Sequence, residues 1–402
     1  MLSYHFLLDL AFILISTKLL GLLTRRIQMP QVVGALLSGL ILGPAILNIV
    51  HETDFIKQVA EIGVIVLMFS AGLETDIKEL VKCGKASLVV AIFGVLLPLG
   101  GGFLVAAIFN NGSLVGLDTK SLLESIFIGV ILTATSVSIT VETLQELGKL
   151  QTRVGTIILG AALIDDILGI LVLTVITSVA TASSNVWIVL LKIIGFFIFA
   201  ALTGIPFNFI FNKYSNKLGQ KRRFPIIAFS FCLALAYLAE HFFGVADIAG
   251  AFVAGLVLST THHAKYIWRR FEIVSYLFLS PIFFASIGIN VRLDTMSTKL
   301  VVFSLVLLVI AILTKILGCG LGALLTGSSK KESLQIGVGM IARGEVALIV
   351  ANIGLAAGLL RDLFFAPVIL VVIVTTIITP IVLKMTYGRN QVQNTLLQQN
   401  QK

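Results

Sequence analysis

Apolar segments of membrane-spanning length follow one another along nearly the whole chain. A helix needs about 20 consecutive apolar residues to cross the hydrocarbon core of a bilayer. Of the 402 residues 57% are hydrophobic and 12% are charged, whereas soluble domains carry about 25% charged residues. Thirteen apolar runs can be counted, the ninth of them short, at 3–23, 31–50, 55–72, 86–108, 124–142, 154–179, 187–211, 224–241, 246–258, 273–290, 299–326, 334–356 and 366–385. The sequence therefore predicts an all-α polytopic membrane protein with about 13 transmembrane helices.

Basic residues are distributed unequally between alternate loops, and this asymmetry predicts the orientation. One set of loops, the basic loops, holds twenty Lys and Arg: Arg25, Arg26, Lys78, Lys82, Lys85, Lys149, Arg153, Lys213, Lys217, Lys221, Arg222, Arg223, Lys265, Arg269, Arg270, Lys330, Lys331, Lys384, Arg389 and Lys402. The other set holds five: Lys57, Lys120, Arg292, Lys299 and Arg361. The positive-inside rule places the basic loops in the cytoplasm, with the N-terminus outside and the C-terminus inside. It also explains the net charge of +9 without a nucleic-acid partner.

No soluble domain is visible between the runs. The loops are at most about a dozen residues long, and residues 386–402 form a short polar tail that we expect to be cytoplasmic and disordered. Residues 1–385 are therefore interpreted as one transmembrane unit. The histidines lack ligand spacing and the three cysteines are far apart, so we expect no cofactor, zinc site or disulfide. The glycines of 318–322 follow no strand and are interpreted as close helix packing instead of a dinucleotide site.

Two adjacent carboxylates, Asp165 and Asp166, lie in the middle of the run 154–179, which contains no Lys or Arg. Each Asp at the centre of a membrane helix costs roughly 2.5–3.5 kcal/mol on insertion scales. An intramembrane carboxylate is by default a candidate for an ion or proton pathway. The alternative is a structural pair that caps a broken helix or forms salt bridges.

Hydroxyl side chains are concentrated in the run 124–142, where residues 133–140 include Thr133, Thr135 and Ser136. Such hydroxyls can satisfy backbone groups freed where a helix breaks inside the membrane. A broken helix exposes carbonyls and helix ends at the bilayer midplane, which suits ion coordination. Simple hydrogen bonding between packed helices is the alternative.

Three further charges lie inside apolar runs. Lys315 is more than ten residues from either end of its run, so it cannot easily reach the interface and needs a buried partner, for which Asp165 and Asp166 are both candidates. Arg343 and Glu345 lie in the glycine-rich run 334–356 and predict a second interrupted helix with an internal ion pair. That pair either supports a site or is purely structural.

Taken together, these motifs resemble the monovalent cation:proton antiporter-2 family, and most closely its bacterial Na⁺/H⁺ antiporters of the NapA type and the short antiporters linked to spore germination. The resemblance extends from the first run to about Leu383. Five segments carry it: Phe69-Ser70-Ala71-Gly72-Leu73-Glu74, Thr133-Ala134-Thr135-Ser136-Val137, Asp165-Asp166, Lys315 and Ala342-Arg343-Gly344-Glu345.

The resemblance implies a homodimer in which dimerisation helices flank a mobile core domain, here containing 86–179 and 299–385. The core would hold two inverted repeats whose discontinuous helices cross at the ion site. Asp166 would bind Na⁺ and H⁺ in turn, with oxygens from Thr133, Thr135 and Ser136 nearby, and Asp165 would pair with Lys315. In this family an Asp-Asp pair with an intramembrane Lys implies electrogenic exchange, whereas potassium-efflux members carry Gln-Asp and a nucleotide-binding domain.

The sequence therefore predicts a secondary active antiporter of the bacterial cytoplasmic membrane that exchanges Na⁺, with Li⁺ or K⁺ as alternatives, for H⁺. A K⁺/H⁺ efflux antiporter and a Na⁺-coupled solute symporter remain competing functions. A channel would need a continuous pore, and no repeated filter loop is visible. An intramembrane aspartyl protease needs two carboxylates that face each other, whereas adjacent helical residues point about 100° apart.

Overall fold

The computed structural model describes residues 4–26, 31–111, 118–181, 186–215, 223–289 and 297–387. All regular secondary structure in these ranges is helical, including one π-helical turn, η2. The helices are α1 (His5–Arg26), α2 (Gln31–Leu42), α3 (Asp54–Glu74), α4 (Ile77–Asn111), α5 (Thr119–Thr133), α6 (Val137–Glu146), α7 (Arg153–Thr181), α8 (Val186–Ser215), α9 (Phe224–Phe243), α10 (Asp247–Ser259), α11 (Ala264–Val274), η2 (Ser275–Leu279), α12 (Ser280–Ile289), α13 (Thr298–Leu325), α14 (Lys330–Gly339), α15 (Glu345–Ala356) and α16 (Asp362–Tyr387).

Every predicted apolar run contains a helix or a pair of helices, which confirms the all-α membrane fold. Within the described ranges, ten segments are long and apolar enough to cross a membrane, and three apolar helices are shorter. The number of spans, thirteen, stays a prediction. The expected tail lies almost entirely outside the described residues.

One run was predicted too long. Residues 31–50 are mostly apolar, but the helix over them ends at Leu42, after 12 residues. Pro44 lies two positions further on, and a proline disfavours the helical conformation of the residue before it, here Gly43. The chain then turns back on itself, with the Asn48 N–H donating to the Gly43 carbonyl at 2.8 Å and Asn48 at a φ of 53°.

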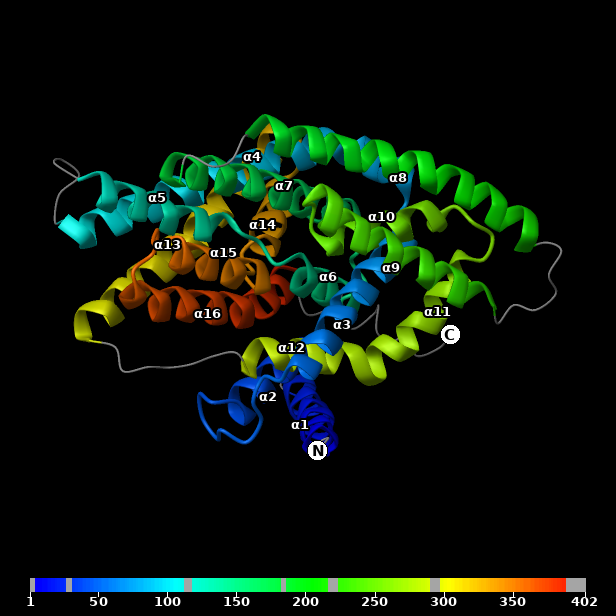
Figure 1. The fold of residues 1–402 in the computed structure, drawn as a ribbon, viewed down its shortest axis with the longest axis horizontal. Coiled ribbons are helices and arrows are strands. Elements are labelled where there is room, and N and C mark those ends of the chain that lie inside the picture. The colour runs from blue at the N-terminus through cyan, green and yellow to red at the C-terminus, as the bar shows by residue number, and fades with distance from the viewer. Residues whose placement is uncertain are drawn as a thin grey trace.

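The helices pack as two groups, visible in Figure 1. The crossing bundle consists of α4–α7 and α13–α16, toward the upper left of the view. The flanking bundle consists of α1–α3 and α8–α12, with α1, α2 and α12 at the bottom and α9–α11 to the right. Helix α8 follows α7 and runs along the top toward the right. The two bundles contact each other where α6 and α16 meet α2, where α6 meets α3 and where α7 meets α8.

The crossing bundle repeats one pattern in opposite directions. A long helix, a broken helix and a second long helix appear as α4, α5–α6 and α7, and again as α13, α14–α15 and α16. Near the start of α5, Glu124 contacts Arg361, which follows α15, whereas Thr140 of α6 bonds to Gly339 at the end of α14. The first half of one broken helix thus lies beside the second half of the other, as expected for inverted repeats.

Glycines allow the long helices of the crossing bundle to approach closely. A Cβ on Gly318 would lie 2.5 Å from the Phe93 carbonyl oxygen of α4, and one on Gly322 would lie 2.9 Å from the Val90 Cα. The interpretation of 318–322 as a helix-packing segment is therefore confirmed.

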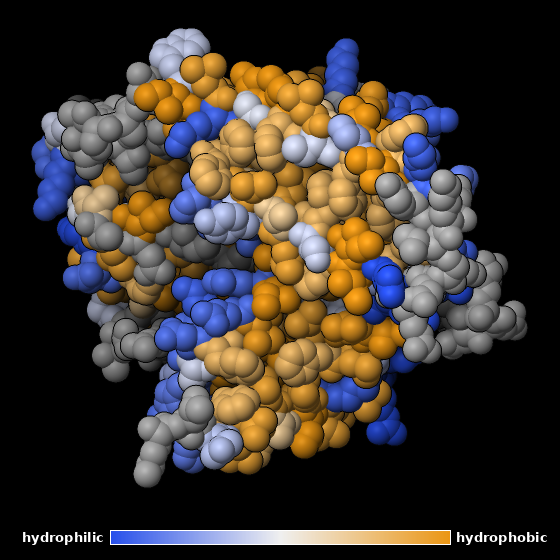
Figure 2. All heavy atoms as spheres, turned by 45° about the vertical axis from the view of Figure 1, so that its right-hand side comes forward, coloured by the Kyte–Doolittle hydropathy of each residue, from blue (hydrophilic) through white to orange (hydrophobic). Residues whose placement is uncertain are grey.

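The outer surface is suited to lipid. Hydrophobic residues cover most of the centre of the face shown in Figure 2, and hydrophilic residues lie mainly toward its edges. Helix α8 contributes large exposed side chains such as Leu202, Ile205 and Phe209. An apolar surface of this extent would not be stable in water, and it fits a multi-pass membrane protein.

Candidate ion site at the crossing of two broken helices

The two helix breaks meet in the middle of the crossing bundle. The first break, at 134–136, separates α5 from α6, and the second, at 340–344, separates α14 from α15. The Ser136 N–H donates to the Ala342 carbonyl at 2.7 Å, and the Thr140 hydroxyl donates to the Gly339 carbonyl at 2.7 Å. A Cβ on Gly344 would lie 2.7 Å from Ser136 Oγ. The crossing is therefore close, and glycine at 344 makes room for it.

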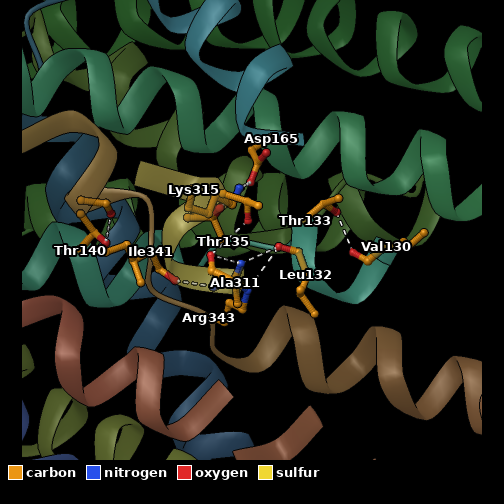
Figure 3. Close-up of polar contacts among 12 residues, drawn as sticks. Val130, Leu132, Thr133, Thr135, Thr140, Asp165, Ala311, Lys315, Ile341 and Arg343 are labelled. Carbon is orange, nitrogen blue, oxygen red and sulfur yellow. Dashed lines mark hydrogen bonds and ion pairs between the residues drawn. The ribbon is translucent and has the colours of Figure 1, made fainter. Parts of the chain in front are cut away.

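Arg343 occupies the point where the C-terminal ends of α5 and α14 converge (Figure 3). Its fully buried guanidinium donates to the carbonyls of Leu132 at 2.8 and 3.3 Å, Ile341 at 3.0 Å and Ala311 at 3.1 Å. Helix C-termini present unbonded carbonyls and about half a negative charge each. One guanidinium thus offsets both dipole ends and supplies the donors that a bilayer lacks.

Asp165 lies on α7 against this crossing and holds two hydrogen-bonded partners. Lys315 Nζ, from α13, is 3.1 Å from Asp165 Oδ2, and the Thr135 hydroxyl donates to the same oxygen at 2.6 Å. All three residues are buried. The residues alone left both aspartates open as partners of Lys315. The structure pairs Lys315 with Asp165, as the family resemblance implied. The other carboxylate oxygen, Asp165 Oδ1, has no hydrogen-bond partner among the residues that the structure describes.

The remaining candidate residues lie in or beside the same region. Asp166 is buried directly after Asp165 on α7, and Ser136 is buried in the first break. Thr133 is also buried, but its hydroxyl donates to the Val130 carbonyl at 2.7 Å within α5, so it supports the end of that helix. The side chain of Glu345 lies outside the described residues, and so does its predicted ion pair with Arg343.

The arrangement combines the chemistry needed to bind a small cation and a proton alternately. Carboxylates, hydroxyls and carbonyls freed by the two breaks are all oxygen ligands, which hard cations prefer. Two buried basic side chains lie in the same region, Lys315 paired with Asp165 and Arg343 between the two breaks. Backbone of this irregular kind is tolerated at membrane depth when it is buried in protein or lines a polar cavity.

Two polar networks were not predicted from the sequence. In the first, Arg361 Nη2 is 2.7 Å from Glu124 Oε2 and 2.6 Å from Asn110 Oδ1, which ties together the ends of α4, α5 and α15. The second joins α6 to α2 and α3 at the opposite end of the bundle. The only sequence signal was a charge at the edge of an apolar run, and such a charge is usually solvated.

This fold and site define a membrane transporter with inverted repeats and a charged site at the crossing of two broken helices. The chain belongs to the sodium/hydrogen exchanger family, because residues 12–387 match the family model described as "Sodium/hydrogen exchanger, transmembrane". This finding confirms the predicted family resemblance, and it places the chain among transporters whose ions are substrates, not among enzymes or cofactor-dependent proteins.

Individual relatives agree with this membership. The chain is 41% identical to the Na⁺/H⁺-K⁺ antiporter GerN of Bacillus cereus over 387 residues, covering 96% of this chain and 97% of GerN. It is 36% identical to a Na⁺/H⁺ antiporter of Enterococcus hirae, covering 93% and 96%. Its fold matches the structure of the sodium proton antiporter MjNhaP1 from Methanocaldococcus jannaschii at pH 8 with a TM-score of 0.69 and 19% identity, covering 96% and 97%.

Proposed function

We propose that this protein is a secondary active antiporter that exchanges Na⁺, or K⁺ or Li⁺, for H⁺ across a bacterial cytoplasmic membrane. The observation that carries this proposal is the pair of buried carboxylates, Asp165 and Asp166, at the crossing of two broken helices. A relative named as a Na⁺/H⁺-K⁺ antiporter, 41% identical, supports both the exchange and the choice of cations.

Asp166 is the carboxylate that binds cation and proton in competition. Asp165 is held by hydrogen bonds from Lys315 and Thr135. The buried Asp166 beside it on α7 matches the carboxylate that the family resemblance assigns to cation and proton binding. In the protonated form Asp166 holds a proton and Asp165 keeps Lys315 as its partner, whereas in the cation-bound form the two carboxylates share the cation. Each carboxylate therefore has a cation or a proton beside it when the site crosses. The deprotonated, cation-free form leaves the Asp166 charge uncompensated and cannot cross easily. Exchange follows because the site cannot cross unoccupied.

Lys315 makes the exchange electrogenic. When a cation recruits oxygens of Asp165 as well as Asp166, the buried ammonium loses its counter-ion. An unpaired buried charge is costly, so Lys315 releases its proton to the aqueous side then open. Two protons then move for each monovalent cation, one from Asp166 and one from Lys315, and net charge crosses the membrane.

Transport proceeds by movement of the crossing bundle, which corresponds to the predicted mobile core of 86–179 and 299–385, against the flanking bundle. The inverted repeats allow the site to open alternately to each side. The flanking bundle also provides the homodimer interface, and the large apolar surface of α8 and α1 is available for it. The basic loops face the cytoplasm, with the N-terminus outside and the C-terminus inside.

The proposal is tested with purified protein in liposomes that contain a pH-sensitive dye. After a proton gradient is imposed, Na⁺, Li⁺ and K⁺ are added in turn, with and without a clamp on the membrane potential. We expect a cation-dependent pH change that depends on the potential. Asp166→Asn should abolish this change, while Asp362→Asn, at an exposed position in the first turn of α16, should retain it.

Three results would contradict the proposal. Wild-type proton movement in Asp166→Asn would reject the assignment of that carboxylate. An exchange unaffected by the clamp would reject the role of Lys315 as a proton carrier. No response to any of the three cations would favour the Na⁺-coupled solute symporter, which Na⁺-dependent uptake of labelled solutes would then identify.

A further inference from the structure

Two side chains at the end of α6 bind the flanking bundle on the side of the basic loops. Gln145 Nε2 donates to Glu74 Oε2, at the end of α3, at 3.1 Å. The backbone N–H of Gln31, the first residue of α2, donates to Glu146 Oε2 at 2.8 Å. All four side chains are partly buried. The two hydrogen bonds therefore join α6 of the crossing bundle to two helices of the flanking bundle.

Glu146 contacts α2 at its N-terminus. The first N–H groups of a helix have no partner within the helix, so an acceptor from another helix satisfies one of them. Since Gln31 begins α2 directly, Glu146 caps that helix from the other bundle.

Apolar residues of the same three helices pack in one hydrophobic cluster, which includes Val141 and Leu144 of α6, Phe69 of α3 and Val32 of α2. Hydrophobic contact is not directional, so such surfaces can slide and pack again in a second position. Hydrogen bonds are directional and hold only near one position. The two polar contacts therefore fix where α6 stands against α2 and α3.

The same helix connects these contacts to the ion site. Helix α6 has 10 residues, about 15 Å at 1.5 Å per residue, and it begins directly after Thr135 and Ser136. Thr135 in turn donates to Asp165. A displacement of the end of α6 therefore moves the first break, because a short helix transmits movement along its axis.

We propose that Gln145 and Glu146 form a latch that holds the crossing bundle on α2 and α3 at the basic-loop side and opens once in every transport cycle. This inference rests on the proposed alternating movement of the bundles. The latch is closed in the present structure, so the conformation described here is the one in which the bundles meet on this side. The opposite possibility is a permanent seam, in which the two bundles never separate at this point.

Cross-linking distinguishes a latch from a seam. Cys83, Cys232 and Cys319, all buried, are first replaced by Ser or Ala, and Glu74→Cys and Gln145→Cys are then combined. A short bis-methanethiosulfonate reagent is used because these residues touch through long side chains. The control combines Glu79→Cys with Lys82→Cys, an exposed pair one turn apart on α4. It reports any effect of the reagent on a single helix.

We expect cross-linking of the α3–α6 pair to lower the exchange rate at least tenfold, with recovery after reduction, and the control to keep its rate. Unchanged exchange in protein shown by mass spectrometry to be cross-linked would overturn the latch. In that case the exchange itself would still stand, so the two proposals fail separately.

A second measurement does not depend on exchange activity. Gln145→Cys alone, in the same background, is labelled with a membrane-impermeant maleimide from the basic-loop side. If the latch opens, the ratio of the Gln145→Cys labelling rate to the Lys82→Cys labelling rate should change several-fold between Na⁺ at high pH and a Na⁺-free buffer at low pH. The ratio is used because pH alone alters the reactivity of every thiol. An equal ratio in both conditions would mean that the bundles do not separate here.

Discussion

The buried pair of Lys315 and Asp165 leads to a prediction about stability that is independent of transport. Lys315→Met removes a fully buried ammonium 3.1 Å from Asp165 Oδ2 with little change in side-chain volume. Asp165 then keeps the Thr135 hydroxyl as its bonding partner, and its Oδ1 remains without one. Removing one member of a buried ion pair typically costs about 3–5 kcal/mol, because the other charge is left uncompensated.

For a chain of this length, the cost corresponds to a fall in apparent Tm of roughly 3–10 °C. Adding Asp165→Asn should restore most of the loss, because replacing both members of a buried pair by neutral groups is often neutral or stabilising. Thr135 can still donate to the amide oxygen of the new side chain. Lys192→Met, at an exposed position on α8, serves as a control and should leave Tm unchanged.

The measurement is thermal unfolding of the purified variants in one detergent, followed by tryptophan fluorescence or by size-exclusion chromatography after heating. Two results would refute the reasoning. A wild-type Tm for Lys315→Met would mean that the ion pair contributes nothing to the folded state. A double variant as unstable as the single one would mean that Lys315 stabilises the bundle by packing and not by charge.

Two further variants test the crossing itself. Arg343→Met leaves the carbonyls of Leu132 and Ile341 without their side-chain donor. At about 1–3 kcal/mol for each buried unsatisfied group, we expect a loss of roughly 2–6 kcal/mol. Expression and thermal unfolding measure it, and near-normal stability would show that Arg343 is not needed at the helix ends. Gly344→Ala places a Cβ 2.7 Å from Ser136 Oγ and should cost about 1–3 kcal/mol and lower exchange. Gly84→Ala, where a Cβ meets no atom within 4 Å, should do neither, and equal effects of the two alanines would contradict the close crossing.

Much of the site could be predicted from the sequence because the bilayer makes buried charge expensive. Asp165, Asp166, Lys315 and Arg343 are conspicuous against apolar runs, and each is buried in the structure. The hydroxyl-rich segment predicted a break in the fifth run, and the structure places the break at 134–136. Both predictions rest on the free-energy cost of placing a polar group in hydrocarbon, and this cost can be judged from the local sequence alone.

The hydrogen-bond partners of Arg343 and the end of the second helix could not be predicted from the local sequence. The prediction for Arg343 considered only Glu345 as a partner, because an ion pair two residues apart can be recognised in the sequence. The carbonyls of Leu132 and Ala311, which actually accept its hydrogen bonds, carry no sequence signal, since every residue has a carbonyl. Hydropathy likewise could not show that the helix in 31–50 ends at Leu42, because the apolar character continues past Pro44.

The sequence by itself determined that the chain is an all-helical membrane protein and which charged residues must be buried together. Both follow from the free-energy cost of placing polar groups in lipid, which each segment carries on its own. The tertiary structure confirmed the pairing of Lys315 with Asp165 that the family resemblance implied. Only the tertiary structure showed that Arg343 donates to carbonyls at both helix breaks, and that Gln145 and Glu146 bind α6 to α3 and α2. These contacts join residues that lie up to 211 positions apart, and they depend on the crossing of the inverted repeats.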